Sequence, residues 1–575
     1  MIKNFLNKEN VKQILILLFV SAFICIPLLS NKIDITYDDG IQHIARLIGL
    51  EASLKEGQTA IIPNLCNGFG YSWNLFYSPL TSFVPLIFRL LGLSYINSIK
   101  AFMFFVTFVS SITMYFFVKD VTKNKKTALL AGIIYIFIPY RITDMYIRNA
   151  LAELTSFVFI PMIFQGLYGL FNQKKNREIL LIIGSGLLIL THTIVAMYVA
   201  IICFIYLLTQ IKKLKIKEVR YNLIYSAIII LTITSFFWLP LLELKTSADY
   251  EVFKPGRMER TEVLKIFKLD FIELFLTTKD SRMIYEIGLL NVVVLILTPL
   301  ALKRLKEKKY KNDKKDFYTL YIFSIVMILL LSFMTLNIFP FEKMPSLLKM
   351  IQFSFRLLEF TGFFTAFIVA VNLECLFKEL KYKHIILITI VLMILSLLFR
   401  THLIYNDDIN IDRLVSGVPV TAQTGRVHAG CASFEYLPSK AFENRNYIET
   451  RSDKVIVIDG TNHKVKIKDE LKTGTNMSFY IENIEKETEI ELPYIYYPGY
   501  KVTLENNNTN EELETYETDK GFVGVTVPKI ENANVTVKYT GTSIMKISKI
   551  LSIIGVLILT LNTFYNKRKI ENGNV

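Results

Sequence analysis

A short polar segment after the first apolar run carries residues that could do acid–base chemistry. It contains the adjacent carboxylates Asp38 and Asp39, and His43 and Arg46 follow Asp39 at i+4 and i+7. That spacing places three ionisable side chains on one face of a helix. A carboxylate there could act as a general base, with a cation beside it to stabilise negative charge. Helix capping by Asp38 or Asp39 is the structural alternative, because Asp is a favoured N-cap residue.

The composition indicates an integral membrane protein. Of the 575 residues, 52% are hydrophobic, including 43 Phe and 30 Tyr, which is too apolar for a soluble chain of this length. The formal net charge of +15 could suggest nucleic acid, but Lys and Arg occur mostly in short loops between apolar runs. The positive-inside rule explains such loops as topology signals, so we expect no nucleic-acid partner.

The five cysteines form neither a CxxC pair nor a metal-ligand spacing. They therefore indicate neither a disulfide framework nor a zinc site. Cys66 and Cys431 are both expected on the outer face, where they could pair or remain two thiols.

The apolar runs predict about twelve membrane-spanning helices. The first, at 14–29, follows three lysines and lacks a cleavage site, which indicates an uncleaved signal anchor with a cytoplasmic N-terminus. The others are expected at 98–118, 127–142, 150–171, 178–191, 193–210, 222–242, 286–302, 317–336, 353–376, 384–400 and 544–565. Segment 79–91 is predicted to be interfacial, because a span there would put the later basic loops outside. Both termini are then cytoplasmic.

Three regions are predicted from this topology. Residues 1–400 form a transmembrane domain with a first outer loop at 31–97, and residues 544–575 form a final span with a short basic tail. Between them, residues 401–543 are polar, with short alternating runs separated by Gly, Asn and Pro turns. Such runs indicate an antiparallel β-sandwich, which the topology places outside the cell. It contains no catalytic triad or metal-ligand cluster.

A second outer loop is dense in charges of both signs. It carries Arg141, Asp144, Tyr146, Arg148 and Glu153 between two predicted spans. A topology signal would carry one sign of charge, so this mixture is better suited to a binding site.

Three further ionisable residues lie at the outer ends of apolar runs. His192 interrupts an apolar run and is expected at an outer turn, where it could equally be a turn residue with satisfied hydrogen bonds. Arg356 and Glu359 lie just inside a predicted span. Charges at that depth usually face a cavity or pair with each other.

Several motifs in order along the chain carry a family resemblance. In addition to the residues above, they are Asn67-Gly-Phe-Gly-Tyr71, Phe76-Tyr-Ser-Pro-Leu80, Gln352-Phe-Ser-Phe-Arg356 and Tyr497-Pro-Gly-Tyr500. The chain resembles bacterial membrane proteins described as 6-pyruvoyl-tetrahydropterin synthase-related and their YfhO-like relatives. Those proteins are similar to polytopic glycosyltransferases of the C type. Nothing in the sequence resembles pterin chemistry.

The resemblance implies an enzyme of the outer face of the bacterial plasma membrane. It would transfer a sugar from a polyprenyl-phosphate donor to a cell-surface glycan or glycopolymer, using a carboxylate of the first outer loop. We expect Asp39, assisted or positioned by Asp38, to take the proton of the acceptor hydroxyl. The leaving phosphate would face Arg148, Arg46 or His43, and Arg356, with Asp144 and Glu153 orienting the arginines. No cofactor is predicted, although a divalent metal could bridge carboxylate and phosphate.

Two other classes of protein share some of these features. A flippase or transporter of lipid-linked sugars would also have many spans and buried charges, but it should have internal repeats and paired broken helices. The sequence pattern indicates neither. A noncatalytic scaffold that presents the β-domain would leave Asp39 dispensable.

The predicted topology can be tested with introduced cysteines. Because basic loops stay inside, cysteines near Lys123 and Lys308 should resist a membrane-impermeant thiol reagent in intact cells, whereas one near Asn508 should react. Labelling near Lys123 would contradict the interfacial assignment of 79–91.

Overall fold

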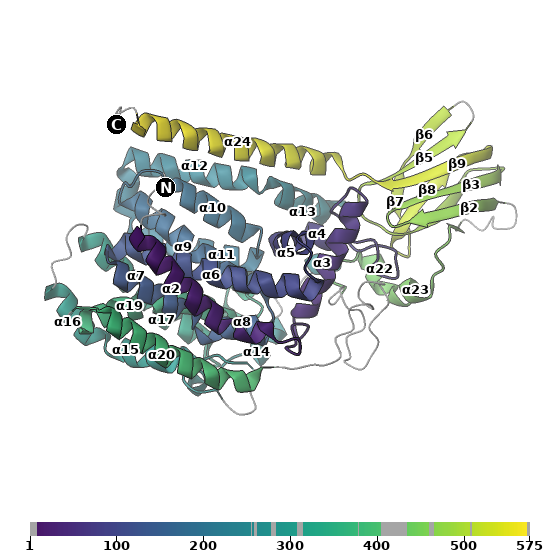
Figure 1. Ribbon diagram of the computed structural model, residues 1–575. Coiled ribbons are helices and arrows are strands. Elements are labelled where there is room, and N and C mark those ends of the chain that lie inside the picture. Colours follow the sequence, from purple (N-terminus) through teal and green to yellow (C-terminus); the bar gives the residue numbers. More distant parts are fainter. Residues whose placement is uncertain are drawn as a thin grey trace.

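The computed structural model combines a bundle of long helices with two β-sheets at one end of the bundle (Figure 1). It describes residues 8–254, 256–257, 261–277, 283–307, 314–377, 379–403, 434–458, 465–506 and 509–571. Cys431 lies outside these residues, as do positions 308 and 508 of the labelling test.

Five helices are long and apolar enough to cross a membrane by length and composition. They are α6 (Tyr95–Thr122), α9 (Leu151–Phe171), α17 (Lys314–Thr335), α19 (Leu357–Leu376) and α24 (Ser543–Glu571). Two bent pairs raise the number to seven within the described ranges: α7 (Lys125–Ile136) with α8 (Pro139–Tyr146), and α12 (Lys217–Ile233) with α13 (Ser235–Ser247). The chain is therefore a mostly helical membrane protein, and the count of twelve spans stays a prediction.

The remaining apolar helices are shorter. They are α2 (Lys8–Ile24), α5 (Leu80–Leu90), α10 (Glu178–Ile189), α11 (Thr193–Thr209) and α20 (Tyr382–Leu398). The predicted span at 286–302 is divided into α15 (Leu289–Ile296) and α16 (Thr298–Glu307). Pro299 lies in the first turn of α16, where it cannot donate a hydrogen bond that would continue α15.

The bent pairs differ from the sequence-based expectation, which included no broken helices. The axes of α7 and α8 differ by 46°, and those of α12 and α13 by 67°. Pro139 is the first residue of α8, so its missing N–H accounts for the break after α7. This break turns the axis of α8 away from that of α7.

Helices α9 and α19 form the centre of the bundle. Nearly every residue of both is buried, as expected for helices that are apolar on all sides. At the periphery, α24 packs along α12 and α13 and leaves a broad apolar face exposed (Figure 1). Such a face suits contact with lipid.

Helix α5 fits the interfacial prediction for 79–91. Its 11 residues extend about 16 Å at 1.5 Å per residue, which is too short for a hydrocarbon core of about 30 Å. Ile87 and Leu90 on this helix are exposed, so an apolar face is available to the bilayer surface.

The C-terminal region contains the predicted antiparallel β-structure. After the short helices α22 (Ser439–Glu443) and α23 (Arg445–Thr450), the strands form two sheets, in the orders β1-β4-β8-β7 and β2-β3-β9-β5-β6. The strands are β1 (Ile456–Val457), β2 (Lys466–Thr473), β3 (Asn476–Ile484), β4 (Thr488–Ile495), β5 (Tyr500–Asn506), β6 (Thr509–Leu513), β7 (Thr515–Glu517), β8 (Phe522–Val527) and β9 (Ile530–Tyr539). Every pairing is antiparallel. Buried and exposed residues alternate along β3 and β9, which is the period-2 pattern seen in the sequence.

Segments predicted as outer loops contribute further short helices. They are α3 (Gly40–Lys55), α4 (Trp73–Phe76), α14 (Thr261–Ile266), α18 (Ser346–Lys349) and the 3₁₀ turns η1 (Ile26–Leu29), η3 (Glu251–Phe253), η4 (Phe271–Leu274), η5 (Phe341–Lys343), η6 (Ser354–Arg356) and η7 (Phe399–His402). At the opposite end, η2 (Ile211–Lys215) carries basic residues. The start of α2 and the end of α24 also lie at the end of the bundle away from the sheets (Figure 1). This arrangement suits two termini on one side of the membrane.

The first outer loop and the β-region share one hydrophobic core. Phe69 is buried in it and meets Phe522 edge to face, with ring centroids 5.3 Å apart. Its carbonyl oxygen accepts a hydrogen bond of 3.0 Å from the Ile495 N–H, and Lys472 Nζ donates to Gly68 O at 2.7 Å. The loop is thus part of the packing of the β-region.

We expect Phe69→Ala to destabilise this shared core by about 3–5 kcal/mol, the usual cost of removing a buried Phe side chain. Limited proteolysis of the full chain should then cut the β-region faster. Leu471→Ala, at an exposed strand position, is the control and should leave the cleavage rate unchanged. Equal rates for both variants would contradict a shared core.

Candidate active site

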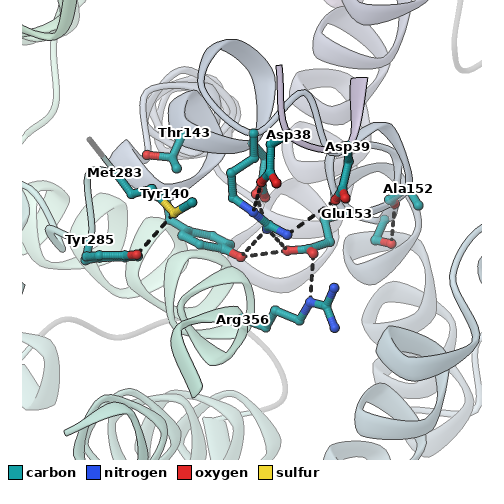
Figure 2. Close-up of polar contacts among 12 residues, drawn as sticks. Asp38, Asp39, Tyr140, Thr143, Ala152, Glu153, Met283, Tyr285 and Arg356 are labelled. Atoms are coloured by element: carbon teal, nitrogen blue, oxygen red, sulfur yellow. Dashed lines mark hydrogen bonds and ion pairs between the residues drawn. The ribbon is translucent and has the colours of Figure 1, made fainter. Parts of the chain in front are cut away.

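A buried guanidinium, that of Arg148, lies at the centre of an ionic cluster between α8 and α9. Its side chain is only 2% exposed. Nη1 is 2.7 Å from Glu153 Oε2 and 2.9 Å from Asp144 Oδ1. Nη2 lies 3.5 Å from Asp39, and Nε lies 3.7 Å from Asp38. Four carboxylates therefore surround one cation, and Figure 2 shows Asp38, Asp39 and Glu153 converging on it.

Local backbone structure explains why these side chains meet. Asp144 and Arg148 are four residues apart and so lie on one side of the turn that ends α8. Asn149 has a φ of 51°, and the Ala150 N–H donates to Asp144 O at 2.8 Å, so the chain reverses into α9. Glu153 then falls in the first turn of α9, where the helix dipole favours an acid.

Glu153 joins a second guanidinium to the cluster. Its Oε1 accepts a hydrogen bond of 2.8 Å from Arg356 Nε, while Oε2 faces Arg148 (Figure 2). Arg356 Nη1 donates to Ile351 O at 3.0 Å and to Gln352 Oε1 at 2.8 Å. The carboxylate thus bridges α9 and the start of α19.

Two aromatic rings cover the arginines. The Arg148 guanidinium lies 5.3 Å from the centroid of Phe355, and that of Arg356 lies 4.9 Å from the centroid of Phe353. The two rings stack with centroids 5.1 Å apart. Such cation–π contacts stabilise guanidinium groups that water does not reach.

Asp39 occupies the N-cap position of α3, but its carboxylate does not cap the helix. Its side chain accepts no hydrogen bond from the N–H groups of the first turn. Instead it faces Arg148 while 46% of the side chain remains accessible. Asp38 beside it has a φ of 49°, a conformation that non-glycine residues adopt at a cost. The contacts of Asp39 therefore do not support the capping alternative.

Surrounding protein changes the proton affinity of Asp39. The pKa of Asp39 is raised to about 6. Burial is the largest cause of this rise, and the positive charge of Arg148 acts in the opposite direction. Water reaches nearly half of this side chain, and its screening weakens the desolvation. We therefore expect Asp39 to titrate above the ordinary pKa of about 3.9 and no higher than about 6.

His43 and Arg46 share the helix of Asp39 but face a different group of residues. Arg46 Nη2 donates to Ser78 O at 3.0 Å, and its guanidinium lies 4.3 Å from the ring centroid of Tyr77. His43 meets the edge of Tyr77. Burial, followed by the charges of Arg46 and His192, lowers the pKa of His43 well below its ordinary value. Arg46 thus holds the Tyr77–Ser78 part of the first outer loop on α3.

Arg141 and Tyr146 lie outside the cluster. Arg141 Nη2 donates to Thr107 Oγ1 at 2.9 Å, and the Tyr146 hydroxyl donates to Ile24 O at 2.6 Å. Successive helical residues are about 100° apart, so Tyr146, two residues after Asp144, leaves α8 on the opposite side. Arg141 precedes Asp144 by three residues and lies on its side of the helix, but its hydrogen bond goes to Thr107. The substrate-binding roles of Arg141 and Tyr146 stay predictions.

Glu359 does not pair with Arg356. Arg356 pairs instead with Glu153, and both carboxylate oxygens of Glu359 are buried without a hydrogen bond among the described residues. The alternative of a local Arg356 and Glu359 ion pair is wrong, because the side chain of Arg356 turns towards α9.

His192 has the turn role that was expected as its alternative, and its role in substrate binding stays a prediction. It is the N-cap of α11, and its Nδ1 accepts a hydrogen bond of 3.3 Å from the Val195 N–H. It also lies close enough to Arg356 and Glu153 for their charges to act on it.

Tyr140 and Gln352 were not predicted as site residues. The Tyr140 hydroxyl donates to Glu153 Oε2 at 2.6 Å and accepts from Arg148 Nη1 at 3.1 Å. Its position one turn before Asp144 was a usable signal in the sequence. Gln352 has a φ of 66°, which the sequence pattern does not indicate.

The described residues contain no group of three His, Cys, Asp or Glu side chains arranged to hold a metal ion. The carboxylates of the cluster face Arg148 instead. These side chains therefore do not fit a divalent metal that would bridge carboxylate and phosphate.

Fold and site define a helical membrane protein with an ionic cluster next to a β-region. Residues 75–406, more than half of the chain, match the family described as "6-pyruvoyl-tetrahydropterin synthase related domain; membrane protein". The chain belongs to this family, which confirms the resemblance seen in its motifs.

Two further comparisons found similar proteins. An uncharacterized protein of Lactococcus lactis subsp. cremoris is 24% identical over 620 residues, covering 99% of this chain and 98% of that protein. The apo crystal structure of the Archaeoglobus fulgidus oligosaccharyltransferase matches with 12% identity and a TM-score of 0.38, covering 77% of this chain and 58% of that one. This structural likeness is partial, and no property of the oligosaccharyltransferase is assigned to this chain from it.

Glu153→Gln tests whether one carboxylate holds the two guanidiniums. Removing one partner from a buried ionic group typically costs about 3–5 kcal/mol, so the thermal unfolding temperature of the detergent-solubilised protein should fall clearly. Glu379→Gln is the control, because that carboxylate is exposed and exposed ion pairs contribute about 0–1 kcal/mol. Equal unfolding temperatures for the two variants would remove Glu153 from this structural role.

Proposed function

We propose that the protein is a membrane glycosyltransferase that moves a sugar from a polyprenyl-phosphate donor to a glycan or glycopolymer at the outer face of the plasma membrane. The observation that carries the proposal is the accessible Asp39 carboxylate, which leaves its capping position to face a buried guanidinium. Membership of a membrane-protein family supports a substrate that is reached at the bilayer.

Asp39 has the properties of a general base. It is the most accessible carboxylate around Arg148, while Asp144 and Glu153 are buried. The raised pKa of Asp39 lies closer to neutral pH than that of an ordinary carboxyl group, which favours proton transfer. Asp38, held 3.7 Å from the same guanidinium, would help to position it.

The proposed transfer is a single displacement. Asp39 takes the proton of the acceptor hydroxyl, and that oxygen forms a bond to the anomeric carbon of the donor sugar. The bond between this carbon and the phosphate oxygen breaks, and the phosphate leaves with the electron pair. One displacement inverts the anomeric carbon. The guanidinium of Arg356, which is paired with Glu153, would stabilise the negative charge that develops on the leaving phosphate.

A flippase or transporter of lipid-linked sugars is the second candidate. The break between α7 and α8, directly before the ionic cluster, favours it, because transporters often bind charged groups at broken helices. A flippase would move its substrate without breaking the sugar–phosphate bond.

Asp39→Asn separates catalysis from structure. The amide has no useful basicity, so sugar transfer from a polyprenyl-phosphate sugar should fall by about 10²–10⁴-fold. Yield and thermal stability should be retained, because Asn keeps the size of Asp and the half-exposed Asp39 side chain does not cap α3. Transfer is measured as release of polyprenyl phosphate by the purified protein.

Asp38→Asn is the matched neighbour and should lose less activity. Normal transfer by Asp39→Asn would remove this residue from the mechanism. Sugar translocation in proteoliposomes without bond cleavage would favour the flippase. A scaffold would show neither activity.

The pH profile gives an independent test. A protonated carboxylic acid is not a base, so turnover should decline as the pH falls through the pKa of Asp39, which is raised to about 6 or slightly less by its surroundings. Activity is therefore retained above this pKa and lost below it. A rate that stays constant between pH 7 and pH 4 would exclude Asp39 as the base.

A further inference from the structure

The proposed reaction needs a hydrogen-bond donor for the leaving phosphate, and the predicted donor Arg148 is already occupied. Its Nη1, Nη2 and Nε face Glu153 and Asp144, Asp39, and Asp38 respectively. A phosphate approaching Arg148 would meet these negative charges first. The cluster therefore positions carboxylates, and the phosphate must be bound by other groups.

Arg356 retains one unused donor group. Its Nε and Nη1 bind Glu153, Ile351 O and Gln352, but Nη2 makes no hydrogen bond in the part of the chain that is described. The side chain is only 8% exposed, and its Nη2 is not sealed from solvent. A nearly buried guanidinium with an open N–H group is a strong donor for an anion.

His192 offers a second donor of known tautomer. Its Nδ1 accepts from the Val195 N–H, so the neutral ring carries its proton on Nε2. Burial, followed by the charge of Arg356, lowers the pKa of His192 to about 3, which keeps the ring neutral at physiological pH. Nε2 makes no hydrogen bond to any residue within the described ranges.

The chain brings these donors next to the first outer loop. Ser78 Oγ donates to Ile189 O at 2.9 Å, and the Leu80 N–H donates to Leu190 O at 2.8 Å. These contacts fix the loop on the turn that carries His192. Tyr77, in the same loop, lies close enough to Asp39 and Arg356 for their charges to act on it. The proposed base and both donors therefore lie near the same segment of the first outer loop, Tyr77–Leu80.

We propose that Arg356 Nη2 and His192 Nε2 form the phosphate-binding subsite of the donor, and that Arg148 is a positioning residue. The assignment rests on the proposed function for the identity of the ligand. The subsite offers one cation, Arg356, which is already paired with Glu153, and one neutral imidazole. The four carboxylates around Arg148 would repel a highly charged ligand, so the subsite suits a phosphate group of low charge. A lipid monophosphate therefore fits better than a lipid diphosphate.

The test measures binding of geranylgeranyl phosphate to the full-length protein in phosphatidylcholine nanodiscs. His192→Asn keeps a capping side chain but removes the Nε2 donor. A hydrogen bond to a charged group contributes enough that Kd should rise roughly tenfold to a hundredfold. Arg356→Lys keeps the charge but removes the guanidinium fork, and Kd should rise similarly.

Matched controls separate this effect from loss of structure. His384 Nδ1 also accepts a backbone hydrogen bond at a helix start, so His384→Asn should leave Kd unchanged. Arg148→Lys should lower kcat while Kd stays within about twofold, which distinguishes positioning from phosphate binding. Geranylgeranyl diphosphate should bind more weakly than the monophosphate.

Unchanged Kd values for both His192→Asn and Arg356→Lys would overturn the subsite, even if the protein transfers sugar. Conversely, a raised Kd in both variants together with no sugar transfer by the natural protein would overturn the proposed function and retain the subsite. Phosphatidylglycerol in the nanodisc distinguishes the source of the phosphate. If it displaces the probe fully, the subsite belongs to bilayer lipid and the donor assignment is wrong.

Discussion

The candidate site depends on the buried guanidinium of Arg148. Burying a cation is costly unless charged partners compensate it, and here the partners come from the loop before α3, from α8 and from α9. Glu153 extends the same network to Arg356 at the start of α19. Because each segment supplies a charge that the others need, the cluster fixes the relative positions of elements that lie far apart in the sequence.

The cluster contains more carboxylates than guanidiniums, and their exposure is graded. Asp144 and Glu153 are buried against Arg148, whereas 30% of the Asp38 side chain and 46% of the Asp39 side chain are accessible. The buried acids hold the cation, and the accessible acids are those that a substrate can meet. One network can therefore serve both stability and proton transfer, with the two tasks divided between different residues.

The β-region is joined to this site through the first outer loop. Phe69 belongs to its core, and further along the loop Tyr77 and Trp73 pack under the guanidinium of Arg46 on α3. Asp39 immediately precedes α3. The packing of the β-sheets therefore helps to fix the orientation of α3, the helix that follows the proposed base. In this way the β-region supports the site structurally.

The sequence by itself determined the membrane class, the main apolar helices, the β-region and the polar residues that are unusual in apolar surroundings, because hydropathy and side-chain period are local properties. Only the tertiary structure decided which charges meet. Arg356 pairs with Glu153, 203 residues away, and not with nearby Glu359. Arg141 and Tyr146 find their hydrogen-bond partners in Thr107 and Ile24, outside the cluster, and α7 and α8 bend apart. Such choices depend on the direction of each side chain and on contacts between distant segments, about which local spacing holds no information.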